Sequence, residues 1–179
     1  KRQFLTPIVL SNMQLNQKRA NIPFAGEFNN CFVTIGGSGA TLGMVIFIAF
    51  FAKSAQLGAL GKASVVPAFF NINEPILFGM PVVYNPYTAI PFFLAPMASM
   101  SMAYFAISMH WVKPMIAQPA WPTPLGLSGF IGTAGDWRAI VLAFVCALVA
   151  FLIWFPFIKF YDGKLYKDEQ AKGAAEAAA

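Results

Sequence analysis

Charged side chains are scarce in this sequence. Asp, Glu, Lys and Arg make up 11% of its 179 residues, whereas hydrophobic residues make up 58%. Soluble domains carry about 25% charged residues, and between Phe28 and Trp111 only Lys53, Lys62 and Glu74 are charged. A soluble fold would therefore lack polar cover, and intrinsic disorder is excluded because it requires low hydrophobicity and high charge. The composition predicts an integral membrane protein.

Cysteine and histidine are also rare. Cys31 and Cys146 lie far apart in apolar stretches and form no C-x-x-C pair, so a disulfide framework, a zinc site and a redox motif have no support. His110 is the only histidine, and it lies beside Trp111 at the end of an apolar span, where a structural role is more common than a catalytic one. No Ser/His/Asp or Cys/His set is available for a hydrolase. We expect no metal site.

The net charge of +5 does not indicate nucleic-acid binding. Eight of the 12 basic residues lie within 1–19 and from Lys159 to Lys172, so most of them flank the apolar stretches instead of covering one face of a domain. Such flanking charges are what membrane topology requires. The chain begins with Lys1 and has no signal-peptide pattern, and we expect it to be a piece of a longer protein.

Three stretches are long and apolar enough to cross the hydrocarbon core, which takes about 20 residues. They are Phe32–Ala52, whose first half is rich in glycine and serine, Tyr87–Val112, in which Pro91 and Pro96 predict kinks, and Ala139–Phe160. The last of these is the most uniformly apolar. The sequence therefore predicts three transmembrane helices.

Two further apolar segments, 65–86 and 114–135, are interrupted too often to be continuous helices. Each contains four prolines, and the second also contains four glycines. Irregular backbone cannot face lipid, so we expect two re-entrant hairpins buried in protein or lining a cavity. In transporters such broken segments indicate the substrate site. The predicted fold is all-α, with three transmembrane helices and two re-entrant hairpins, as part of a larger multi-span transporter.

The predicted organisation has three parts. Residues 1–31 would form an amphipathic, interfacial lead-in. Residues 32–161 would form part of a transport domain, and residues 162–179 a polar tail that is either a solvated helix or disordered.

Glu74 is the only carboxylate in residues 28–135. A carboxylate at membrane depth costs at least about 2.5 kcal/mol, so it persists only when it is paired, protonated or solvated in a cavity. One interpretation is a cap on the helix that starts at Pro75. Asn71 and Asn73 favour more, because the three polar side chains together would suit the hydroxyl groups of a neutral, polyhydroxylated ligand.

Trp121 lies in a rigid, proline-rich run at 119–124. It is interpreted either as an interfacial tryptophan or as an aromatic platform for the apolar face of a sugar. The other three tryptophans lie near span ends and are expected to be interfacial: Trp111, Trp137 and Trp154.

Two other motifs have simpler interpretations. The run Gly36-Gly37-Ser38-Gly39 resembles a phosphate loop but lacks the Gly-Lys-Ser/Thr ending. It favours close helix packing, with a backbone-lined cavity wall as the second choice. Asp136 and Arg138 are expected to form a local polar cap at the start of the last span.

Several motifs taken together resemble a known family. They are Gly36–Leu42, Phe70–Ile76 followed by Phe78-Gly79 and Asn85-Pro86, and Gly135–Arg138. In this order they resemble the C-terminal part of the membrane-embedded IIC component of bacterial sugar phosphotransferase systems, in the lactose/cellobiose/diacetylchitobiose branch. The resemblance covers residues 23–164.

The resemblance implies a function and a site. Such a protein binds a disaccharide of the cellobiose, chitobiose or lactose type, carries it inward, and holds it while its C6 hydroxyl is phosphorylated. The phosphoryl donor is a phosphocysteine on a separate IIB protein, so no cofactor is implied. Glu74 would be the catalytic carboxylate and would contact the sugar, Asn73 would hydrogen-bond the sugar, and Trp121 would stack on it or border it.

One departure from the family matters. The family's site also uses a histidine before the glycine run, and no histidine precedes Gly36 here. The family protein is more than twice as long, and its N-terminal half forms most of a homodimer interface. We therefore expect a fragment that by itself neither transports nor phosphorylates, in the bacterial cytoplasmic membrane with a cytoplasmic C-terminus. The alternatives are an ion- or proton-coupled secondary transporter that uses Glu74 as its coupling carboxylate, and a non-transporting membrane scaffold.

Overall fold

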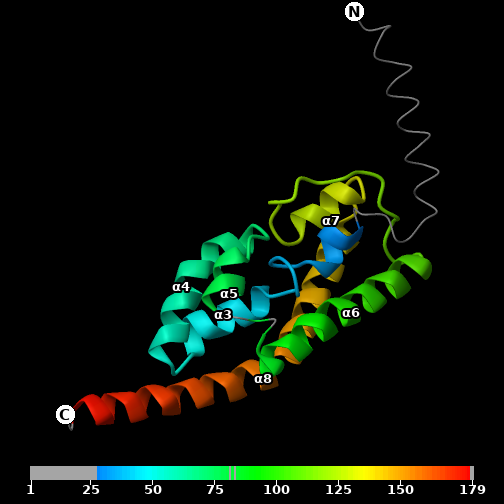
Figure 1. The fold of residues 1–179 in the computed structure, drawn as a ribbon. Coiled ribbons are helices and arrows are strands. Elements are labelled where there is room, and N and C mark those ends of the chain that lie inside the picture. Colours follow the sequence, from blue (N-terminus) through cyan, green and yellow to red (C-terminus); the bar gives the residue numbers. More distant parts are fainter. Residues whose placement is uncertain (1–27, 81, 83, 178–179) are drawn as a thin grey trace, which may run out of the picture.

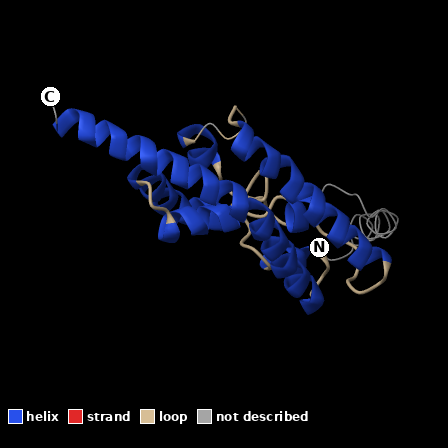
Figure 2. Ribbon diagram, turned by 90° about the horizontal axis from the view of Figure 1, so that it is seen from below, coloured by secondary structure: helices blue, strands red, loops and turns tan. Residues whose placement is uncertain are grey.

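The computed structural model describes residues 28–80, 82 and 84–177, and every regular element in this part of the chain is helical (Figure 2). This confirms the predicted all-α class, while most of the predicted lead-in lies outside the described residues. In chain order the elements are the short π-helical turn η1 (Asn29–Val33) and the helices α3 (Leu42–Phe51), α4 (Ala55–Phe69), α5 (Glu74–Gly79), α6 (Pro86–Ser108), α7 (Leu127–Gly132) and α8 (Trp137–Ala177).

Two of these helices, α6 and α8, are long and apolar enough to cross a membrane. They correspond to the second and third predicted spans. Helix α6 begins where the Asn85 side chain accepts a hydrogen bond from the Tyr87 N–H at 3.1 Å, which satisfies one of the N–H groups that a helix start leaves unpaired. Small side chains let the two helices approach closely: the Ser99 hydroxyl donates to the Cys146 carbonyl at 3.3 Å.

The first predicted span, Phe32–Ala52, is not one continuous helix. Its second half forms α3, which has only 10 residues, and its first half is a loop after η1. Gly36, Gly37 and Gly39 have φ values of 76°, 93° and 83°, in the left-handed region that interrupts a right-handed helix. The prediction of a third span-length helix is therefore wrong for the described residues, because those glycines build a loop.

Helix α3 pairs with α4 through a short turn at 52–54 (Figure 1). Gly61 on α4 makes this approach close, since a methyl group there would overlap the backbone of Ala49. The backbone of α4 ends in a turn at which Asn71 has φ 61°. The break predicted within 65–86 therefore falls at 70–73, between α4 and α5.

The second predicted broken segment, 114–135, is irregular up to the short helix α7. Two hydrogen bonds fold its ends together, because the N–H groups of Ile116 and Ala117 donate to the Gly132 carbonyl at 2.8 and 3.1 Å. Like the first segment, it is a broken stretch, as the proline and glycine content predicted.

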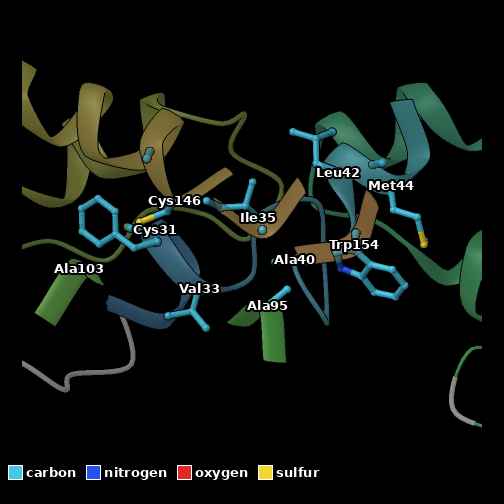
Figure 3. Packing of buried hydrophobic residues seen from close by; sticks show 14 of the residues in the cluster. Cys31, Val33, Ile35, Ala40, Leu42, Met44, Ala95, Ala103, Cys146 and Trp154 are labelled. Atoms are coloured by element: carbon cyan, nitrogen blue, oxygen red, sulfur yellow. The ribbon is translucent and has the colours of Figure 1, made fainter. Parts of the chain in front are cut away.

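The core lies where η1, the glycine loop, α3 and α6 meet the apolar part of α8 (Figure 3). Trp154 is fully buried there, and its indole N–H donates to the Gly39 carbonyl at 2.9 Å. The prediction that Trp154 lies at the membrane interface is therefore wrong. Its indole N–H finds an acceptor inside the protein because the glycine loop presents a carbonyl group to it.

The polar residues from Asp162 onward continue α8 without a break to Ala177. Figure 1 shows this part of α8 running past the turn between α3 and α4 towards the C-terminus. Of the two predicted forms of the tail, the described residues therefore adopt the helical one.

Candidate functional site

Asn71 joins three segments that are far apart in the sequence. Its side-chain oxygen accepts the Gly36 N–H at 2.8 Å, and its amide group donates to the carbonyls of Trp121 at 3.3 Å and Thr123 at 3.1 Å. The side chain is nearly buried, with 7% of its surface exposed. Because a carboxamide both donates and accepts, one asparagine holds the glycine loop and the proline-rich run to the end of α4.

Trp121 returns a hydrogen bond to the same residue. Its indole N–H donates to the Asn71 backbone carbonyl at 3.2 Å, yet 47% of the side chain is exposed. The proline-rich run thus holds the ring by its nitrogen and leaves the rest of the ring partly open. Such an arrangement suits an aromatic surface that receives a ligand, and it differs from a tryptophan packed in a core.

Asn73 is turned into the protein. Its amide group donates to the Ser38 carbonyl at 2.7 Å and to the Thr41 hydroxyl at 3.2 Å, and only 3% of the residue is exposed. Gly37 lies directly against the Asn73 carboxamide, so a methyl group at Gly37 would overlap it. In this structure the donor capacity of Asn73 serves the glycine loop.

Glu74 follows as the first residue of α5 and is exposed. No described residue donates a hydrogen bond to its carboxylate, so all of its acceptor capacity is open. Pro75 directly after it suits the start of a helix, where a proline loses no hydrogen bond. Of the three situations expected for this carboxylate, pairing with a described residue is not seen, and the side chain is exposed.

The structure therefore brings together the residues that the sequence singled out. Glu74 and Asn73 lie at the turn between α4 and α5, and Trp121 is hydrogen-bonded to that same turn. Asn71 was predicted only as a polar neighbour, although it makes the central contacts, and Thr41 was missed. Thr41 is fully buried and donates to the Gly36 carbonyl at 2.7 Å. We call Asn71, Asn73, Glu74 and Trp121 the tip cluster.

His110, Lys113, Asp136 and Arg138 line a separate pocket near the start of α8, which contains no residue of the tip cluster. The Asp136 carboxylate accepts the N–H groups of Lys113 at 3.0 Å and Arg138 at 3.1 Å. The first of these bonds is the main cause that lowers the pKa of Asp136 from its ordinary value of 3.8. Asp136 is thus a local cap, as predicted. The described residues hold no group of three or more His, Cys, Asp or Glu side chains placed for a metal ion.

A groove of about 920 Å³ lies between the C-terminal end of α6 and the N-terminal end of α8. Its lining is mostly apolar and includes Phe105, Trp111 and Trp137, but none of the tip cluster. An apolar groove at this place fits contact with lipid or with another part of a membrane protein, and it offers few polar groups for a sugar.

Two long apolar helices and a pair of broken helical segments that meet at a polar cluster fit the class of helical membrane proteins, in whose transporters such broken segments form the substrate site. Comparison of the sequence with known protein families identifies the family. The model described as "Phosphotransferase system, EIIC" matches residues 3–96, just over half of the chain, and the chain belongs to this family.

Its curated relatives place it in the lactose/cellobiose/chitobiose branch. It is 40% identical over 144 residues to the PTS system cellobiose-specific EIIC component of Lactococcus lactis subsp. lactis, covering 80% of this chain and 29% of the relative. It is 36% identical over 183 residues to the PTS system lactose-specific EIICB component of Streptococcus mutans serotype c, and this match covers 97% of this chain and 32% of the relative.

A solved structure agrees with the fold. The crystal structure of the transporter ChbC, the IIC component from the N,N'-diacetylchitobiose-specific phosphotransferase system, matches with a TM-score of 0.79 and 37% identity. The match covers 82% of this chain and 34% of that chain. The chain thus spans about a third of the length of the relatives it matches.

Proposed function

We propose that this chain is the C-terminal part of a phosphotransferase-system sugar permease that binds a disaccharide, carries it across the membrane and holds it for phosphorylation. The observation that supports this most is the meeting of three motifs at Asn71. It places an open carboxylate, Glu74, on the same turn that holds the partly open ring of Trp121. Relatives named for cellobiose, lactose and diacetylchitobiose favour a disaccharide as the substrate.

The chemistry assigned to these residues is simple. The C6 hydroxyl oxygen of the sugar attacks the phosphorus of a phosphocysteine on a IIB protein. The new O–P bond forms as the S–P bond breaks, and the cysteine sulfur leaves as a thiolate. Glu74 accepts the hydroxyl proton, which is the contribution that a carboxylate can make to phosphoryl transfer.

Binding falls to the other members of the tip cluster. Trp121 presents its ring to the apolar face of the sugar, and the Asn73 side-chain oxygen, which receives no hydrogen bond from a described residue, accepts one from a sugar hydroxyl. The remaining contacts, including a histidine that this chain lacks before Gly36, come from the rest of the permease. The complete protein works as a homodimer in the bacterial cytoplasmic membrane, with its C-terminus in the cytoplasm.

The test is Glu74→Gln in the complete permease that contains this chain, assayed in vesicles with phosphorylated IIB protein. We expect the rate of sugar phosphorylation to fall about 10²–10⁴-fold, the usual contribution of a general base. Sugar binding should weaken far less, because glutamine keeps one acceptor oxygen and the shape of the side chain. Asp168→Asn is the matched control, because Asp168 is an exposed carboxylate on α8, and it should leave the rate unchanged.

Unchanged phosphorylation in Glu74→Gln would remove Glu74 from the reaction. Proton or sodium flux that needs neither sugar nor IIB protein, and that Glu74→Gln abolishes, would favour the alternative of an ion-coupled transporter.

A further inference from the structure

The polar end of α8 carries two carboxylates that bind the backbone at the start of α4. Asp162 and Glu169 are seven residues apart, about two helical turns, and so lie on one face of α8. Asp162 is nearly buried, with 4% of its surface exposed. A buried carboxylate requires hydrogen-bond donors. The turn before α4 supplies them.

Asp162 and Glu169 together bind four consecutive backbone N–H groups, from Lys53 to Gln56. Asp162 accepts the Lys53 N–H with both of its oxygens at 3.0 Å and the Ser54 N–H at 3.0 Å. Glu169 accepts the N–H groups of Ala55 at 3.0 Å and Gln56 at 3.1 Å. A helix start leaves its first N–H groups without partners, and here they are bound by a different helix.

Ser54 connects the two kinds of cap. Its hydroxyl donates to Glu169 at 2.6 Å and accepts the Leu57 N–H at 3.2 Å. The local cap that begins α4 is thus itself held by α8. We call Asp162 and Glu169, with the turn they bind, the C-terminal clasp.

The far end of α4 carries the tip cluster. Helix α4 has 15 residues, which corresponds to about 22 Å, and the turn after it holds Asn71 against Gly36. The same α8 also binds the glycine loop, through the hydrogen bond from Trp154 to Gly39. Helix α8 therefore binds both the start of α4 and the glycine loop, the two segments that meet at Asn71.

We propose that Asp162 and Glu169 are positioning residues, which set the location of α4 and thereby hold the Asn71 turn in register with the glycine loop. The clasp makes α8, α3 and α4 move as one body when the sugar site changes sides. Its effect on sugar binding rests on the proposed function, whereas its effect on the register does not.

The experiment measures backbone hydrogen exchange residue by residue in the complete permease in detergent. Glu169→Ala should speed exchange of the Ala55 and Gln56 amides about tenfold or more, since it removes the acceptor of both. It should also speed exchange at Gly36, whose N–H donates to Asn71 at the opposite end of α4. Asp168→Ala, one residue away on an exposed position, removes the same charge without touching the clasp, and it should change neither.

The conservative variant sharpens the test. Glu169→Gln keeps one acceptor oxygen but loses the other, so exchange at Ala55 and Gln56 and at Gly36 should lie between the wild-type and Glu169→Ala values. If Glu169→Ala proves unstable, Asp162→Asn provides the same comparison, with the Lys53 and Ser54 amides as its local readout. In each stable variant the dissociation constant of the disaccharide should rise in parallel with exchange at Gly36.

Faster exchange at the amides bound by the substituted carboxylate, with unchanged exchange at Gly36, would overturn the proposal, because the clasp would then be only a local cap. Parallel changes at both places that Asp168→Ala lacks would support it. If the wild-type permease binds no disaccharide, the proposed function fails, and the exchange at Gly36 still decides whether the clasp positions the tip cluster.

Discussion

At the scale of single residues, Asn71 combines two properties that few side chains offer together. Its backbone has φ 61°, a region that glycine and asparagine adopt more readily than other residues. Its carboxamide makes one hydrogen bond as acceptor and two as donor, all to backbone groups. Asparagine therefore ends α4 and fastens two other segments to that end in a single position.

These two properties can be separated by substitution. Asn71→Gly keeps the backbone conformation and loses the three hydrogen bonds, which should lower the stability by about 1–3 kcal/mol for the buried groups left unpaired. Asn71→Ala loses the same bonds and adds the steric cost of a left-handed alanine, about 1–2 kcal/mol more. The measurement is thermal or denaturant unfolding in detergent for the wild type and both variants.

The expected order of stability is wild type, then Asn71→Gly, then Asn71→Ala. Equal stability of the two variants would show that the left-handed backbone relaxes without cost. A glycine variant as stable as the wild type would show that the three hydrogen bonds contribute nothing.

At this scale the sequence singled out residues of the tip cluster, but it did not predict their contacts. Glu74 stood out because it is a lone carboxylate in an apolar stretch, which can be recognised from the sequence alone. The direction of an amide side chain cannot be recognised in this way, because it depends on which backbone groups reach it after folding. Asn73 and Asn71 look equivalent in the sequence. Asn73 nevertheless binds Ser38 and Thr41, whereas Asn71 binds both the glycine loop and the proline-rich run.

At the scale of elements, the start of α8 depends on Asp136. The carboxylate accepts the Arg138 N–H two residues on, as a helix cap does, and the Lys113 N–H from the loop after α6. The pKa of Asp136 is lowered in the folded protein, first by the bond from Lys113. Its stabilisation is therefore fully present above the unfolded pKa and is lost as the pH falls through the folded pKa.

This gives a prediction with a defined pH window. At neutral pH, Asp136→Ala should lower the stability by about 0.5–2 kcal/mol, the usual cost of removing a cap. The difference from the wild type should stay constant as the pH falls towards 3.8, the ordinary value for the carboxyl, and should shrink below it. Unfolding midpoints of both proteins between about pH 7 and about pH 2.5 provide the measurement.

Asp168→Ala provides the control, because it removes an exposed carboxylate from the same helix and should change the midpoint little at any of these pH values. A difference between Asp136→Ala and the wild type that persists unchanged at the lowest pH would contradict an ionised cap.

The elements also show where periodicity and composition reach their limit. Ala139–Phe160 was predicted correctly as one continuous apolar helix, because an uninterrupted apolar run of this length has few alternatives. Phe32–Ala52 is nearly as apolar, but three of its glycines adopt left-handed conformations. Hydropathy does not distinguish a glycine that packs in a helix from one that ends it. The pairing of α3 with α4 depends on that difference, so it was not predicted.

At the scale of the whole molecule, α6 and α8 run in opposite directions with matched ends. Tyr87 at the start of α6 lies 5.0 Å from Phe160 of α8, measured between ring centres. At the other ends, the Lys113 N–H meets Asp136. The stretch of α8 from Arg138 to Phe160 rises about 33 Å, close to the hydrocarbon thickness of about 30 Å.

Aromatic and basic residues mark the same two levels. Trp111 and Trp137 are 68% and 65% exposed at one level, as tryptophans at an interface are. At the other level Lys164 lies 5.5 Å from the centre of the Tyr87 ring. We therefore expect the clasp and the rest of the polar end of α8 to lie outside the membrane, on the side of Tyr87.

This arrangement predicts opposite accessibility for two introduced cysteines. Lys113→Cys and Gly173→Cys should react with a membrane-impermeant maleimide from opposite sides of sealed vesicles, Gly173→Cys from the cytoplasmic side. Cys31 and Cys146 of this chain give little background because they are buried. Labelling of both variants from one side would contradict the antiparallel crossing, since α8 alone separates the two positions. Labelling from opposite sides but with Gly173→Cys outside would keep the crossing and reverse the proposed orientation, which would place the clasp on the face where the sugar enters.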